Sequence, residues 1–141
     1  MAPPVLFGHR ASLRRRYKGG VRVVDAMNVV GSRPDGWWRD REGALERLIT
    51  EVDRWAEGAG ERVVVVLEKQ PRRPLETDAV EVAWATRRGR NAADGEIVQR
   101  LPQWLAEDPD LTVVTSDRDL AERVRSLGGA VEGAGGFLRL L

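Results

Sequence analysis

Aspartate and glutamate are the residue types in this sequence whose placement best suits a chemical role. The 141-residue chain contains no cysteine, which excludes a disulfide framework, a thiol nucleophile and a thiolate metal site. Its one histidine, His9, lies near the first residue, which argues against a histidine-rich zinc site and a Ser-His-Asp triad. Polar catalysis must therefore rely on carboxylates, hydroxyls and basic groups.

Several of the acids follow or flank short β-branched runs, where the strands of an α/β protein would end. Ligands of open α/β sheets bind outside the carboxyl ends of the strands, so acids at those ends are expected at one edge of the sheet. Burying such acids side by side is costly unless a cation balances them. The acids come from four segments of the chain: Asp25, Glu68, Asp94, and the pair Asp117 and Asp119.

Some of these acids also have an ordinary structural explanation. Ser116 with Asp119, and loosely Asn91 with Asp94, have the three-residue spacing of a helix capping box. Acids in the first turn of a helix interact favourably with its dipole as well. Asp25 is different, because no helix is expected directly after it.

Clustered carboxylates without histidine or cysteine suit hard cations that prefer oxygen ligands, namely Mg²⁺ or Mn²⁺. Such ions bind phosphate oxygens, help to generate a hydroxide nucleophile and stabilise a leaving oxygen. Arginines in two loops are candidates to bind substrate phosphates, although each could equally be solvated loop charge. They are Arg72, Arg73, Arg87, Arg88 and Arg90.

The spacing of apolar residues predicts the elements that would position these side chains. Strands are expected at residues 21–25, 62–68, 80–84, 111–115 and 130–132, with a loop at 31–36 after the first strand. The helices expected between them run from about 37 to 56, from Asn91 until Pro102 kinks or ends it, and from a Ser116 cap to Leu127. This order predicts an α/β fold, Rossmann-like and three-layered (α/β/α), with a mostly parallel central sheet.

The charge distribution divides the chain into two parts. Residues 1–20 carry five basic residues and no acid, whereas residues 21–141 carry 18 basic against 22 acidic residues. A basic arm on a mildly acidic domain suggests contact with a polyanion such as nucleic acid, and an unstructured solubilising terminus is the alternative. No stretch has the length of a membrane span and the start lacks a secretion signal, so a cytoplasmic location is expected.

Three stretches of the chain resemble, in order and spacing, the NYN domains, which are PIN-like ribonucleases, and in particular their YacP-like bacterial subgroup. The stretches are Val23-Val24-Asp25-Ala26-Met27-Asn28-Val29-Val30-Gly31, Asn91-Ala92-Ala93-Asp94 and Val113-Val114-Thr115-Ser116-Asp117-Arg118-Asp119. The resemblance runs from about residue 21 to residue 141. The early Asp-x-x-Asn motif and the late Ser-Asp-x-Asp motif are fairly specific together, whereas either alone is weak.

The resemblance implies a PIN fold and a metal-dependent endoribonuclease that uses Mg²⁺ or Mn²⁺. Its substrate would be RNA, either free or presented by a ribosome. The subgroup usually closes its second strand with an aspartate, where this chain has Glu68 followed by Lys69. By position in the motifs, Asp25, Asp94 and Asp117 would hold the metal, Asp119 would assist, and Asn28 would orient water or a ligand of the metal.

Two other classes of function compete with a nuclease. A non-catalytic RNA- or ribosome-binding module with the same fold would also account for the arginine-rich loops. A phosphatase of the haloacid-dehalogenase type needs a second aspartate two residues after the first, and Met27 occupies that position. Neither of the common glycine-rich phosphate loops is present, which argues against a nucleotide-driven enzyme.

Overall fold

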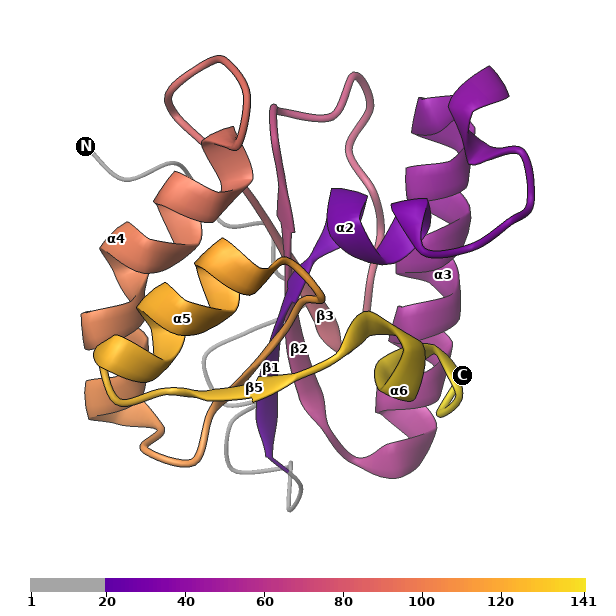
Figure 1. The fold of residues 1–141 in the computed structure, drawn as a ribbon. Coiled ribbons are helices and arrows are strands. Elements are labelled where there is room, and N and C mark those ends of the chain that lie inside the picture. Colours follow the sequence, from indigo (N-terminus) through magenta and orange to yellow (C-terminus); the bar gives the residue numbers. More distant parts are fainter. Residues whose placement is uncertain (1–19) are drawn as a thin grey trace.

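A five-stranded sheet forms the centre of the protein in the computed structural model, which describes residues 20–141 (Figure 1). The strand order is β3-β2-β1-β4-β5, and each neighbouring pair is parallel. The basic arm predicted for residues 1–20 lies, apart from Gly20, outside the described residues. The strands are β1 (Val21–Asp25), β2 (Arg62–Leu67), β3 (Val80–Trp84), β4 (Thr112–Val114) and β5 (Ala130–Glu132).

Helices cover both faces of this sheet, which confirms the α/β fold with three layers and a parallel sheet. One buried cluster joins a face of the sheet to α2, α3 and α6, and a second joins the opposite face to α4 and α5 (Figure 1). The helices are α2 (Ala26–Gly31), the 3₁₀ turn η1 (Trp37–Arg39), α3 (Arg41–Ala59), α4 (Ala92–Glu107), α5 (Arg118–Ser126) and α6 (Ala134–Leu138).

The valine run of β2 explains how one strand serves both faces. Val63 and Val65 pack in the first cluster, whereas Val64 and Val66 pack in the second. Successive side chains of a strand point to opposite faces, so a strand that is covered twice must be apolar at every position. This alternation places β2 in the interior of the sheet, as the run predicts.

The direction of the strand order reverses between two neighbouring strands. The chain leaves β1 towards β2 and β3, and then returns past β1 to form β4 and β5. In doubly wound sheets, ligands bind where the order reverses in this way, outside the carboxyl ends of the strands. Here that point lies between β1 and β4, where Val24 is level with Val114.

One sequence expectation about helices was wrong: a short helix, α2, begins directly after Asp25, although no helix was expected there. Of the two outcomes expected at Pro102, a kink or an end of the helix, the end is wrong, because α4 continues through Pro102 to Glu107. Pro102 is exposed and removes one backbone donor, but Leu101 before it is fully buried and Trp104 after it packs in the same cluster, so tertiary packing keeps the helix continuous.

The end of the chain docks on the body, as its apolar character predicts. Phe137 in α6 is fully buried, and Leu138 and Leu141 pack against the first cluster. None of the helices within residues 20–141 combines the length and apolar character needed to cross a membrane.

Candidate functional site

Asp25 lies at the centre of the acidic edge. It is the last residue of β1 and only 4% exposed, and the Thr115 hydroxyl donates a hydrogen bond of 3.2 Å to its Oδ2. Although it occupies the N-cap position of α2, its side chain makes no capping bond. Burial, and then the nearby charge of Asp94, raise the pKa of Asp25 from 3.8 to about 7, against the lowering effect of the Thr115 hydroxyl.

Asp94 is the second acid of this edge, half-buried in the first turn of α4. Burial and then the charge of Asp117 raise its pKa, while a hydrogen bond with Asp25 opposes that change. Glu68, exposed directly after β2, adds negative charge that raises the pKa of both Asp25 and Asp94. Four of the predicted acids therefore act on one another near the carboxyl ends of β1, β2 and β4, and the charge of Arg123 opposes the rise in the pKa of Asp94.

The loop after β4 is built differently from the sequence expectation. Asp117, not Ser116, caps α5, because its Oδ1 accepts a bond of 2.9 Å from the Leu120 backbone N–H. The backbone is still extended at Asp117, so the helix begins one residue later than expected. The predicted capping box therefore does not form, and Asp119 is an exposed residue in the first turn of α5.

Asn28 joins the two segments that follow β1 and β4. Its Oδ1 accepts a bond of 2.8 Å from the Ser116 backbone N–H, which links α2 to the loop after β4. Ser116 Oγ in turn accepts a bond of 2.9 Å from the backbone N–H of Ala134, at the start of α6. The Thr115 hydroxyl, which bonds Asp25, also accepts from the Asp117 backbone N–H at 3.1 Å. These bonds hold the acidic edge in a defined position.

A groove of about 1280 Å³ lies beside the acidic edge and shares Glu68 with it. Its floor and walls come from the end of β2, the loops after β2 and β3, and the start of α3. The lining is predominantly basic, with seven basic against four acidic side chains. The basic residues are Arg39, Arg41, Lys69, Arg72, Arg73, Arg87 and Arg88, and the acidic ones are Asp40, Glu42, Glu46 and Glu68.

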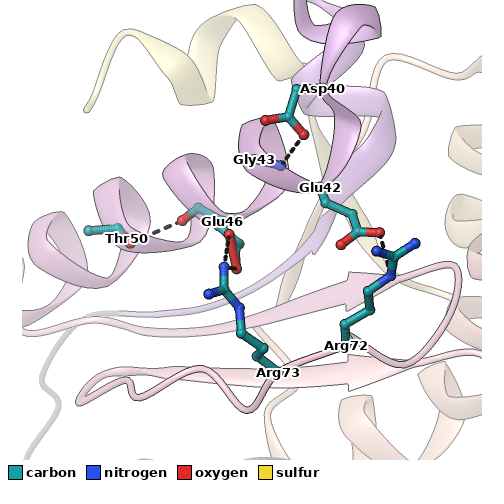
Figure 2. Close-up of polar contacts among 7 residues, drawn as sticks. All are labelled: Asp40, Glu42, Gly43, Glu46, Thr50, Arg72 and Arg73. Carbon is teal, nitrogen blue, oxygen red and sulfur yellow. Dashed lines mark hydrogen bonds and ion pairs between the residues drawn. The ribbon is translucent and has the colours of Figure 1, made fainter.

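Two of the predicted arginines are held by acids of α3. Arg72 pairs with Glu42 at 3.0 Å and Arg73 with Glu46 at 3.2 Å, and all four side chains are at least one-third exposed (Figure 2). Figure 2 shows both pairs on the same side of α3, bridging it to the loop after β2.

Of the other predicted arginines, Arg87 and Arg88 line the groove, whereas Arg90 is exposed but does not. Sequence reasoning missed Arg39, Arg41 and Lys69 as groove residues, and Thr115 as the partner of Asp25. Lys69 stands next to Glu68, and that adjacency is the one local signal that could have indicated it.

The acids meet part of the requirement for a divalent cation. Within residues 20–141, no group of three or more His, Cys, Asp or Glu side chains forms a ready-made metal site. Mg²⁺, however, keeps several waters and often uses only one or two carboxylates together with substrate phosphates. Asp25 and Asp94 supply that number of hard oxygen ligands. Burial first, and then the charge of a neighbouring carboxylate, raise the pKa of each, and a bound cation would favour the charged form of both.

Comparison with known proteins places this architecture in a defined class, an α/β fold with a parallel five-stranded sheet like that of YacP. Two solved structures of Rae1 (YacP) from Bacillus subtilis are similar to the chain at 25% sequence identity. The W164L mutant aligns with a TM-score of 0.68 over 86% of this chain and 74% of Rae1, and the other structure with 0.66 over 86% and 72%. No protein-family model matches the sequence. No curated protein sequence matches it either.

Proposed function

We propose that this protein is a metal-dependent endoribonuclease that hydrolyses RNA phosphodiester bonds at the acidic edge. The observation that carries the proposal is that a predominantly basic groove shares Glu68 with a set of mutually coupled carboxylates, of which Asp25 is buried and Asp94 half-buried. A polyanionic chain is attracted by the groove, and an acidic site beside it suits a divalent cation that binds phosphate oxygens. The structural similarity to YacP agrees with the family that the sequence motifs resemble.

On this proposal, Asp25, Asp94 and Asp117 are the residues that hold Mg²⁺ or Mn²⁺. When bound, the cation supplies Lewis-acid activation of the scissile phosphate and stabilises the charge that develops on it. Asp117 keeps Oδ2 for this purpose, because Oδ1 is used in capping α5. Asp119 and Glu68 lie farther out and are exposed, where they would adjust the charge around the substrate.

The other residues of the chain would position the substrate. Arg87 and Arg88, which make no ion pair with another residue in 20–141, are available to bind phosphates in the groove. Asn28 keeps α2 and the loop after β4 together through its bond to Ser116, and its side-chain NH₂ group is the part available to a substrate or to water.

The test is cleavage of an end-labelled RNA by the purified chain with Mn²⁺ or Mg²⁺, with and without ribosomes. Asp25→Asn should lower the rate at least about a hundredfold, because it removes a charge from the proposed cation site. Asp110→Asn is the matched control. Asp110 is exposed and lies before the amino end of β4, so this variant should cleave RNA at the wild-type rate. RNA that stays intact in every condition, or equal cleavage by Asp25→Asn, would contradict the proposal.

A second candidate is a non-catalytic RNA- or ribosome-binding module. The observation that favours it is the lack of a ready-made group of three ligands for a cation in the described part of the chain. Calorimetric titration with Mn²⁺ distinguishes the two: a nuclease of the proposed kind takes up the ion in a manner that depends on Asp25. A pure binder retains RNA but shows no such uptake.

A further inference from the structure

Trp38, next to the groove, is the most exposed large apolar side chain among residues 20–141. About 55% of its surface is in contact with solvent, compared with 44% for Leu127 and 42% for Leu140. Tryptophan is on average a strongly buried residue, although a single exposed apolar side chain is unremarkable on its own. The surroundings of Trp38 are what give its exposure meaning.

The turn that carries Trp38 is anchored rather than free. Gly36 adopts a left-handed conformation (φ 78°), which a residue with a side chain rarely adopts, and thereby starts the η1 turn. Trp37 then packs against the first buried cluster, and its ring meets that of Trp38 edge-to-face at 6.0 Å. At the other end of the turn, Asp40 caps α3 by accepting from the Gly43 backbone N–H at 3.0 Å (Figure 2). Trp38 is therefore presented to solvent by a turn held at both ends.

Basic side chains connect this ring to the groove. The guanidinium of Arg39 lies 5.8 Å from the centre of the Trp38 ring, and that of Arg41 lies 5.4 Å from Trp37. Both arginines line the groove, whereas Trp38 itself does not, so Arg39 is the residue that links the Trp38 ring to the groove. The segment that leads into α3 also lies at the same end of the molecule as the loops that follow β2 and β3 (Figure 1).

An exposed aromatic face beside arginines and a basic groove is the arrangement that binds unpaired nucleotides. The ring stacks on a base, which it can do for every base type, and the arginines bind the flanking phosphates. A base-paired duplex keeps its bases stacked inside and cannot offer one to the ring. The net positive lining of the groove favours this polyanion over a protein partner of mixed charge.

We propose that Trp38 is a base-stacking residue, which holds an unpaired nucleotide while Arg39 and Arg41 bind the adjoining phosphates. This inference rests on the proposed function because it takes RNA as the ligand. It concerns RNA binding alone, so it does not require that the protein cleaves RNA. It adds a nucleotide-binding position at the start of α3, separate from the carboxylates at the ends of β1 and β4.

The test measures binding of a fluorescent 12-nucleotide oligouridylate to the full chain in EDTA, which prevents metal-dependent cleavage. Trp38→Ala should weaken binding roughly tenfold, whereas Trp38→Phe, which keeps an aromatic face, should lose much less. Leu127→Ala removes a comparably exposed apolar side chain from the end of α5 and serves as the matched control. Equal thermal unfolding of the variants shows that the fold is retained.

An oligomer of the same length without bases separates stacking from other effects. It should bind the wild-type chain and Trp38→Ala equally, because phosphate contacts remain and no base is present to stack. The inference would be overturned if Trp38→Ala lost affinity equally for both oligomers. It would also be overturned if Trp38→Ala bound oligouridylate as tightly as the wild type, which is the result expected if the ring docks a protein instead. If the wild-type chain binds no RNA at all, the proposed function fails as well; if it binds but does not cleave with metal, only the nuclease proposal fails.

Discussion

At the scale of single residues, Asp25 is a position whose ionisation destabilises the folded protein. The side chain is almost completely buried and lies near the charge of Asp94, so the folded protein holds its proton up to a pH of about 7. The unfolded chain releases that proton near its ordinary pKa of 3.8. The folded state therefore binds more protons between these values, and stability falls as the pH rises from about 4 to about 7.

Asp25→Asn should remove this penalty, because an amide cannot ionise and its carbonyl can still accept from Thr115. At pH 8 the variant should be more stable than the wild type by on the order of 3 kcal/mol, while at pH 4.5 the two should be close. Urea unfolding at both pH values measures this difference. A difference that is the same at pH 4.5 and pH 8 would contradict the assigned pKa.

A divalent cation should restore part of the stability that the wild type loses when Asp25 ionises. If Mn²⁺ binds at Asp25 and Asp94, it stabilises the wild type at pH 8 in proportion to its saturation and leaves Asp25→Asn unchanged. The same substitution would thus raise stability and abolish the proposed activity, as is common where a functional site keeps charges that the fold alone would avoid.

At the scale of elements, the connection between β2 and β3 shapes the groove without a helix of its own. Asp53 of α3 holds its far end by accepting from the backbone N–H groups of residues 78–80, at 2.7 Å for Ala79. Nearer the groove, the Glu42–Arg72 and Glu46–Arg73 pairs join the connection to the start of α3 (Figure 2). The acids of α3 therefore compete with any phosphate for two of the groove arginines.

The double variant Glu42→Gln with Glu46→Gln should bind RNA more tightly, by roughly three- to tenfold, because the arginines lose their acidic partners and the groove loses two negative charges. Fluorescence anisotropy at two salt concentrations measures this gain. The unfolding free energy should change by less than about 1 kcal/mol, since exposed ion pairs contribute little.

The control for charge alone is the double variant Glu57→Gln with Asp110→Asn. It changes the net charge equally, but neither residue lines the groove. If this control gains as much affinity, the effect is one of total charge. Weaker binding by the Glu42 and Glu46 variant would mean that the two acids hold Arg72 and Arg73 in the conformation that RNA requires.

At the scale of the whole molecule, the strand order decides where a site can form. The return of the chain from β3 to β4 places β4 beside β1, so that Thr115 reaches Asp25 from 90 residues away in the sequence. The last helix, α6, then supports this arrangement from one face of the sheet. Phe137 fills that face, its ring 5.7 Å from Trp55 of α3, and Arg22 of β1 lies over both rings.

Phe137→Ala should destabilise the protein by about 3–5 kcal/mol, because it empties a fully buried position in the first cluster. Thermal or urea unfolding measures the loss. Leu140→Ala, at an exposed position three residues later, should change stability by no more than about 0.5 kcal/mol. Equal effects of the two substitutions would show that α6 does not pack on the sheet as described.

Local pattern in the sequence was sufficient for the strands and for the acids at their ends. The valine run of β2 suits a strand covered on both faces, and acids that directly follow such strands are expected at the carboxyl edge of a parallel sheet. That reasoning located Asp25, Glu68 and Asp117, and the helix start at Asn91 located Asp94, because each placement depends on pattern within a few residues. It failed for α2, which begins where no helix was expected, and it left open whether the helix ends at Pro102, where packing against the sheet keeps α4 continuous.

Only the tertiary structure decided which of these acids act on one another and what lies beside them. The high pKa of Asp25 depends on burial and on Asp94, and the Thr115 hydroxyl donates a hydrogen bond to its side chain; neither residue is its neighbour in the chain. The groove likewise combines residues from four separate segments, and Arg39 and Arg41 were missed because nothing within their own turn indicates what they face. Periodicity reports which side of an element is buried, whereas desolvation and charge coupling depend on distances through space that only the folded chain defines.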